Sequence, residues 1–233
     1  MIGGLDFSVV LDNLSYFFIG RYPKGPLGGV GLTLYLAVVS LALSFLGGLI
    51  LGLLSVSRNR VIKWGSMAII QSIRGMPLLM VIFWMFFLVP AMLGGGISAS
   101  WTIIVALTLF TSAYMSEIVR AGIVGIPKGQ TEAAISTGLS HGQAMFYIIL
   151  PQALRNMIPS FVNQFVSMIK DTSLAFIVGV SELTQIATQM NNRTMLYPTE
   201  IFLFIALVYF VICFAFTELS RWLERRLAYR KAI

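Results

Sequence analysis

Residues 75–116 read GMPLLMVIFWMFFLVPAMLGGGISASWTIIVALTLFTSAYMS and contain no Asp, Glu, Lys or Arg. A helix needs about 20 mostly apolar residues to cross roughly 30 Å of hydrocarbon, so this stretch is long enough for two crossings. Pro90 and the glycine run at 94–96 interrupt it and predict a turn. Together with the residues just before it, the stretch predicts membrane-spanning helices near 64–89 and 98–120.

The composition of the whole chain agrees with a membrane protein. Of its 233 residues, 58% are hydrophobic and 11% are charged, whereas soluble domains carry roughly a quarter charged residues. An ordinary cytosolic enzyme is therefore excluded. With one cysteine, Cys213, and one histidine, His141, the chain has no intrachain disulfide or multi-histidine metal site.

Three further apolar segments predict helices on either side of the opening stretch. Residues 27–57 are uncharged, the run at 157–180 is interrupted only by Lys170 and Asp171, and residues 201–217 are uncharged again. The fold class expected is all-α integral membrane, with five transmembrane helices in one domain over residues 27–222. An external segment, residues 1–26, precedes this domain, and a cytoplasmic basic tail, residues 223–233, follows it.

The distribution of cations predicts how the helices are oriented. A net charge of +7 would suggest nucleic acid in a soluble protein, but in a membrane protein Lys and Arg concentrate in cytoplasmic loops, so no nucleic-acid partner is expected. With the C-terminus inside, the outer face carries only Arg21, Lys24 and Arg193. The inner face then carries Arg58, Arg60, Lys63, Arg120, Lys128, Arg155, Arg221, Arg225, Arg226, Arg230 and Lys231.

The N-terminal residues predict a helix that lies on the outer surface of the membrane. Between Asp6 and Phe18, apolar side chains recur near one helical face, as in an interfacial helix. A disordered lead-in is the alternative. The first 25 residues lack a basic region followed by a small-residue cleavage site, so no removable signal peptide is expected.

The connection at 121–155 is long for a compact bundle and carries a spaced motif. Glu132-Ala133-Ala134 is followed after three residues by Gly138, and after nine more by Ile148, Leu150 and Pro151. Small residues at 133 and 134 allow a helix to sit deep in a groove, and glycine allows the chain to turn with positive φ. The pattern predicts a helix from about residue 130, a turn at Gly138, and a second helix from His141 that ends at Pro151.

This spacing resembles the EAA loop of binding-protein-dependent ABC importers of type I. The resemblance extends to 116–122, to 170–174 (KDTSL) and to 74–78 (RGMPL), and it covers most of residues 28–222. The polar amino acid branch, with its histidine, glutamine and glutamate/aspartate permeases, is the most similar. The resemblance implies ATPase coupling through Glu132, Ala133, Ala134, Gly138, Ile148, Leu150 and Pro151.

The resemblance also implies a set of partners. Two ATPase subunits would bind the cytoplasmic loops, a periplasmic amino acid binding protein would deliver the amino acid substrate, and a second copy or a homologous permease would complete the pathway in the bilayer. The chain has no Gly-x-x-x-x-Gly-Lys-Ser/Thr sequence, which cradles ATP phosphates. ATP and Mg are therefore expected on the ATPase subunits, with no cofactor, no metal and no catalytic residue in this chain.

Charged residues at bilayer depth cost at least about 2.5 kcal/mol near a helix centre and usually face a pore or a partner. Arg74 or Lys170 could therefore pair with a substrate carboxylate. Lys170 could instead pair with Asp171 or Glu117, and Glu117 with Arg120 one helical turn away. The candidates for the substrate pathway are Arg74, Lys170, Asp171, Thr172 and Ser173.

Two alternatives to the importer remain at this point. An ion-coupled secondary transporter or channel would use Lys170 and Asp171 as ion-sensing groups, although no inverted repeat of the kind typical of such carriers is visible. An inert membrane scaffold would tolerate Glu132→Lys. The outer residues 182–200 are expected to form either a short external helix or gate that faces a binding protein, or a solvated loop.

Overall fold

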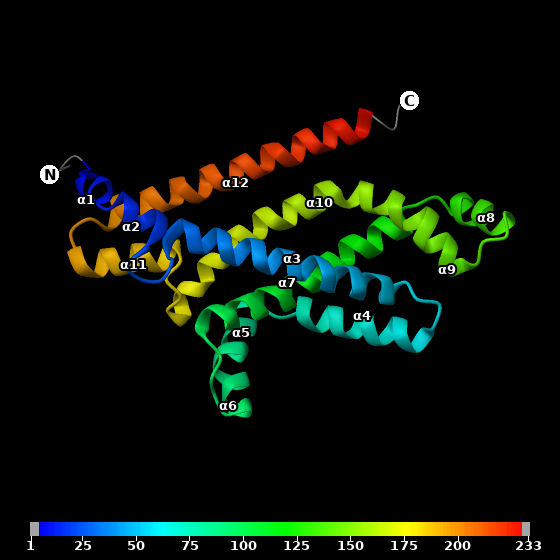
Figure 1. Ribbon diagram of the computed structural model, residues 1–233, viewed down its shortest axis with the longest axis horizontal. Coiled ribbons are helices and arrows are strands. Elements are labelled where there is room, and N and C mark those ends of the chain that lie inside the picture. Colours follow the sequence, from blue (N-terminus) through cyan, green and yellow to red (C-terminus); the bar gives the residue numbers. More distant parts are fainter. Residues whose placement is uncertain (1–4, 230–233) are drawn as a thin grey trace. The chain divides into compact units, whose positions relative to one another are not determined.

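The computed structural model describes residues 5–229, and the regular elements in that range are helical (Figure 1). Contacts divide the chain into two compact units. The first unit comprises residues 5–42, 77–107 and 165–215, and the second comprises 43–76, 108–164 and 216–229. Each unit has its own buried core, so the two are described in turn.

Three helices are long and apolar enough to cross a membrane in the described part of the chain: α3 (Gly29–Ser55), α7 (Ala99–Val124) and α12 (Pro198–Tyr229). The helices expected at 27–57 and 98–120 are confirmed. Helix α12 is longer than the expected 201–217 and continues through most of the expected tail. Arg230 and Lys231 lie outside the described residues.

The single helix expected over 64–89 is wrong. Helix α4 (Arg60–Arg74) ends at Gly75, and α5 (Leu78–Phe83), the π-helical η1 (Trp84–Leu88) and α6 (Val89–Leu93) form a separate helical run. Pro77 explains the break, because its ring fixes φ, here −64°, and disfavours helical backbone at the preceding residue. By length and composition, the two pieces together qualify as a fourth crossing.

The segment expected as the crossing over 157–180 forms two elements. Helix α10 (Leu150–Asp171) gives way to the 3₁₀ segment η3 (Thr172–Val178), which ends at Gly179 with φ 78°. Among the described residues, α10 is not one of the helices apolar enough to qualify as a crossing. Its first part carries Arg155 and several amides, which lower its hydropathy. The fifth crossing therefore stays a prediction.

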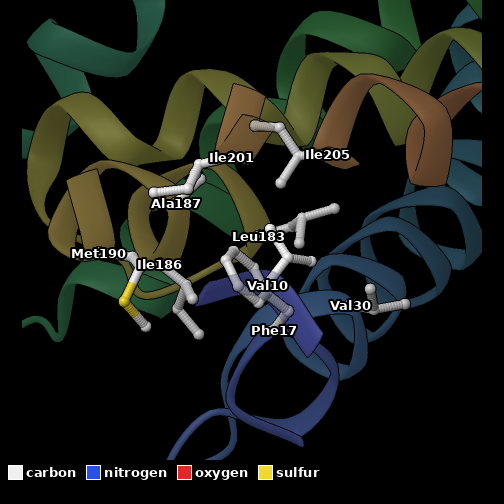
Figure 2. Packing of buried hydrophobic residues seen from close by; sticks show 9 residues of the cluster. All are labelled: Val10, Phe17, Val30, Leu183, Ile186, Ala187, Met190, Ile201 and Ile205. Atoms are coloured by element: carbon white, nitrogen blue, oxygen red, sulfur yellow. The ribbon is translucent and has the colours of Figure 1, made fainter. Parts of the chain in front are cut away.

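The core of the first unit packs the N-terminal residues against α11 (Leu183–Thr194) and the start of α12. Val10 and Phe17 come from α1 (Ser8–Leu11) and α2 (Leu14–Ile19), and they pack with Leu183 and Ile186 of α11, as Figure 2 shows. The N-terminal segment is therefore two short helices rather than one, and it is not a disordered lead-in. Its buried face is covered by protein, and its expected position at the outer membrane surface stays a prediction.

The core of the second unit rests on small residues in α3. Gly52 faces α7 so closely that an added Cβ would lie 2.6 Å from Cβ of Val119. Val119 and Ile123 of α7 in turn pack against Met157 of α10. Glycine lets these backbones approach, as small residues do between membrane helices, and this packing supports the long connection at 121–155.

Candidate functional site

The connection that carries the spaced motif is a helical knob in the second unit. Helix α8 (Lys128–Ser136) is followed by a turn at Gly138 with φ 89°, and α9 (His141–Gln143) continues into the π-helical η2 (Ala144–Ile149). Ser140 starts α9 with a capping box in which it exchanges hydrogen bonds with Gln143. The expected helix, turn and second helix are confirmed.

The expected end of the second helix at Pro151 is wrong. Helix α10 begins at Leu150, so the chain stays helical through Pro151. A proline in a helix removes one N–H and crowds the carbonyl four residues back. The wider π-helical turn immediately before it, a form common as a local bulge, accommodates this. The Gln152 side chain donates to the Ile148 carbonyl at 2.8 Å, which satisfies an acceptor near the proline.

The motif residues divide into an exposed set and a buried set. Glu132 and Ala133 are exposed on α8, whereas Ala134 and Leu150 are buried within the unit. Helix α8 packs against η2, and the Gln152 amide donates to Oε1 of Gln130 at 3.1 Å. The knob is therefore braced by its own chain, and Glu132 and Ala133 are the motif side chains on α8 that a partner could contact.

Beside the knob, the second unit has a mainly apolar cavity of about 590 Å³. The loop between α3 and α4 contacts the knob next to this cavity: a guanidinium nitrogen of Arg58 lies 2.6 Å from Nε2 of His141. Phe146, which lines the cavity, is 59% exposed. An exposed aromatic ring next to an apolar cavity is typical of a surface that a partner protein covers.

Arg74 and Glu117 form a charge cluster elsewhere in the second unit. Glu117 accepts from Arg120 at 2.9 Å and lies 3.5 Å from Arg74, whose guanidinium stacks over the Tyr114 ring at 5.3 Å. Gln71 also donates to Glu117, at 3.3 Å. The expected pair of Glu117 with Arg120 is confirmed. Arg74 has a carboxylate partner within the chain, which weakens its candidacy as the substrate counter-charge.

The other four pathway candidates lie in the first unit, and the structure separates them. Lys170 and Ser173 line a cavity of about 320 Å³. Thr172 is fully buried and donates to the Ile169 carbonyl at 2.7 Å, and Asp171 does not line the cavity. Within the described residues, Lys170 makes no ion pair within 4.0 Å, so neither of its expected structural partners holds it.

Sequence reasoning missed the polar network on the other side of this cavity. Glu182 is fully buried at the start of α11 and accepts the backbone N–H groups of Thr184 and Gln185, each at 2.8 Å. The Tyr209 hydroxyl of α12 donates to the same carboxylate at 2.9 Å, and the Thr184 hydroxyl lies 3.2 Å from the Tyr209 oxygen. Thr184 and Tyr209 both line the cavity.

Two features of the sequence could have indicated this network. Tyr209 is a hydrogen-bonding side chain in an otherwise apolar run, and such a group needs a partner when buried. Glu182 precedes a helix, where a carboxylate can accept the free N–H groups of the first turn. Burial raises the pKa of Glu182 to about 7, against the lowering effect of the hydrogen bonds from Thr184, Gln185 and Tyr209.

Comparison with known proteins identifies the chain's relatives. Residues 44–229 match the family described as "Binding-protein-dependent transport system inner membrane component". A probable glutamine ABC transporter permease protein, GlnP of Bacillus subtilis, is 42% identical over 90% of this chain and 98% of its own length. The glutamate/aspartate import permease protein GltK of Escherichia coli O157:H7 is 34% identical over 96% and 98%.

Solved structures of ABC transporters also resemble this chain. A crystal structure of an amino acid ABC transporter with histidines superposes with a TM-score of 0.85 at 32% identity, and the match covers 96% of this chain and 100% of that chain. The MetNI methionine ABC transporter in an inward-facing conformation shares the fold, with a TM-score of 0.69, 23% identity and coverage of 84% and 94%. The chain therefore belongs to the binding-protein-dependent transport family, as an inner-membrane permease subunit of an amino acid ABC transporter and not an enzyme.

Proposed function

We propose that this chain forms the membrane pathway of an ATP-driven, binding-protein-dependent importer of polar amino acids with acidic or amide side chains. The relatives named for glutamine and for glutamate/aspartate support this substrate range. The family match also favours the importer over the ion-coupled carrier. The pathway works by alternating access between the two sides of the inner membrane.

The geometry of α8 is the single observation that carries the proposal. A separate ATPase can drive transport only if its closed and open states bind the permease differently. That requires a rigid element that transmits its motion. The knob around Gly138 is braced by the Gln130–Gln152 bond and offers Glu132 and Ala133 to a partner. Two ATPase subunits, which carry ATP and Mg, bind two such knobs in the complete importer.

The assembly follows from the number of helices. A handful of membrane helices encloses too little space for an amino acid pathway, so the chain pairs with a second copy or with a homologous permease. The cation distribution favours a periplasmic N-terminus and a cytoplasmic C-terminus. A periplasmic binding protein then delivers the amino acid to the outer surface. Residues 182–200 are expected on that surface, and α11 is the short helix within them.

The substrate contacts proposed here begin with Lys170. It is exposed, and it lines the 320 Å³ cavity together with Ser173. An ammonium group that makes no ion pair within 4.0 Å among residues 5–229 suits the α-carboxylate of an amino acid. The other pathway candidates are weaker. Asp171 does not line this cavity, Thr172 donates to the Ile169 carbonyl, and Arg74 pairs with Glu117.

Reconstitution into proteoliposomes tests the proposal. The permease, its ATPase and its binding protein are expected to accumulate labelled glutamine only when ATP is present on the ATPase side. Glu132→Lys is expected to abolish uptake and ATPase co-purification, while Lys63→Glu, a charge reversal at another exposed position, on α4, serves as the control. Uptake that persists without ATPase and follows an ion gradient would establish the secondary carrier instead.

A further inference from the structure

The cavity beside Lys170 has a partly polar lining. It is bounded by α10 and η3 through Lys170 and Ser173, by α11 through Thr184, and by α12 through Tyr209 and three apolar side chains. Its polar side-chain groups are therefore one ammonium and three hydroxyls. What such a cavity binds depends on which hydroxyl hydrogens are free to be donated to a ligand.

Glu182 fixes the direction of two of these hydrogens. An ionised carboxylate only accepts hydrogen bonds, so the Tyr209 hydroxyl must donate in its 2.9 Å contact with Oε2 of Glu182. The Tyr209 hydrogen is then committed. Among the described residues, the Thr184 hydroxyl then has only acceptors beside it, the Tyr209 oxygen at 3.2 Å and the Glu182 carboxylate, and its hydrogen is used in donating to one of them. Both oxygens keep lone pairs, but neither keeps a hydrogen for a ligand.

The third hydroxyl is committed as well. Ser173 donates to the Lys170 carbonyl one helical turn back, at 2.6 Å. Each hydroxyl of the lining thus presents an acceptor to the cavity, and the Lys170 ammonium is its one side-chain donor. This arrangement complements a ligand that carries one carboxylate together with N–H groups.

We propose that this cavity binds an α-amino acid with an N–H-bearing, amide side chain, and that Glu182 is the positioning residue that makes the cavity select it over the corresponding acid. Lys170 takes the α-carboxylate, and the hydroxyl oxygens of Thr184, Tyr209 and Ser173 accept from the ammonium and amide groups. A second carboxylate would meet only acceptors there. This inference rests on the proposed function and narrows its substrate class.

The expected discrimination arises from unpaired polar groups, and it is smaller than in a closed site because Lys170 is exposed and the hydroxyl side chains are only partly buried. A site built to hydrogen-bond one group rejects an analogue that leaves the buried partners unpaired more strongly than an apolar pocket rejects a change of size. Glutamine and glutamate are nearly equal in size, so shape alone cannot separate them. We expect glutamine to bind at least about tenfold more tightly than glutamate.

Direct binding to the purified permease–ATPase complex in nanodiscs, without the binding protein, tests the inference. Labelled glutamine and glutamate are titrated at pH 8. Glu182→Gln is expected to reduce the glutamine-to-glutamate affinity ratio, because a neutral amide, which has both a donor and an acceptor, no longer obliges the Tyr209 hydroxyl to donate. Lys170→Ala is expected to weaken both ligands alike. Glu218→Gln, at an exposed carboxylate paired with Arg221, is the matched control.

Further variants keep the test decisive if Glu182→Gln does not fold. Tyr209→Phe and Thr184→Val each remove one hydroxyl while keeping the side-chain shape, and each is expected to lower the ratio. Tyr209→Phe is also expected to lower the thermal melting temperature, because it removes a donor to the buried Glu182 carboxylate. The inference is overturned if the wild-type complex binds glutamate as tightly as glutamine, if it binds neither, or if all three variants keep the wild-type ratio. ATP-driven uptake by the same preparation would still stand, so failure of the inference is distinguishable from failure of the proposed function.

Discussion

The carboxylate of Glu117 on α7 lies 3.5 Å from the guanidinium of Arg74, which is the last residue of α4. A second guanidinium, that of Arg120, lies 2.7 Å from the same carboxylate. One acidic group thus balances two cations, and the side chain of Glu117 is only 18% exposed. This cluster ties the end of α4 to α7 just before the break at Gly75 and Pro77.

Glu117→Gln is expected to destabilise the protein by about 1–3 kcal/mol, since it leaves two partly buried guanidinium groups without a countercharge. Thermal unfolding of the purified permease in detergent measures the change. Glu218→Gln removes a carboxylate with the same spacing to an arginine, but at an exposed position, where the loss is expected to be about 0–1 kcal/mol. Equal shifts in the two variants would contradict a structural role for the cluster.

The sequence predicts the long helices well because hydropathy is a property of whole segments. Uncharged runs identified α3 and α7 regardless of what packs on them. The break in the expected helix over 64–89 was missed, although Pro77 is visible in the sequence. A proline is also compatible with a kinked but continuous membrane helix, and packing decides between the two outcomes.

The small residues of α3 give a second prediction. At Gly52 an added Cβ would lie 2.6 Å from Cβ of Val119 and 3.0 Å from the backbone oxygen of Ser116, which cannot move without shifting α7. Gly52→Ala is therefore expected to cost about 1–3 kcal/mol through overpacking. Guanidinium or thermal unfolding in detergent checks it.

Gly65→Ala in α4 is the control for this effect, because no atom lies within 4 Å of its added Cβ. Alanine is a better helix former than glycine at such an open position, so this variant is expected to gain about 0.5–1 kcal/mol. If the two alanine variants changed stability in the same direction, close packing would not be the reason for glycine at 52.

The candidate site was only partly predictable, for a physical reason. Lys170 stands out in an apolar run, since an isolated charge at bilayer depth is costly wherever it occurs. Glu182 and Tyr209 are 27 residues apart, and only the packing of α11 on α12 brings them together. Thr172 is close to Lys170 in sequence, but positions two residues apart on a helix do not face the same side, and Thr172 faces the interior.

The two neighbouring alanines of the knob separate docking from folding. Ala133 is exposed, whereas Ala134 is 6% exposed and buried within the unit. Ala133→Leu is expected to leave the melting temperature within the small range of surface substitutions but to reduce ATPase co-purification and uptake, because the added bulk blocks the partner's groove. Pull-down of the ATPase by tagged permease measures docking.

Ala134→Leu is expected to do the opposite and lower the stability of the permease by about 1–3 kcal/mol. Melting curves of the permease alone report this loss. A permease with Ala133→Leu that bound the ATPase normally and transported at the wild-type rate would show that this face of α8 does not dock the ATPase.

The selectivity proposed for the cavity depends on pH in a definite direction. Burial raises the pKa of Glu182 to about 7, so the carboxylate is ionised well above pH 7 and protonated well below it. Tyr209 of α12 is the titratable side chain that contacts Glu182. Helix α3 contributes the uncharged Thr33, which accepts from the Leu183 N–H at 3.1 Å, next to Glu182 in the chain. Lys170 is the charged group that lines the cavity.

Lowering the pH from 8 to 6 is expected to reduce the glutamine-to-glutamate affinity ratio severalfold, because a protonated Glu182 has its own hydrogen to donate and no longer fixes the direction of the Tyr209 and Thr184 hydroxyls. The stability of the fold changes in the opposite direction to the affinity ratio. The pKa of Glu182 is raised in the folded state to about 7, so the folded state holds this proton more tightly, and the contribution of Glu182 to stability is lost as the pH rises from the unfolded pKa toward 7. Titration of both ligands at pH 6, 7 and 8 measures the ratio. Glu182→Gln, which cannot ionise, should give one ratio at all three pH values, and a pH-dependent ratio in that variant would assign the effect to another group.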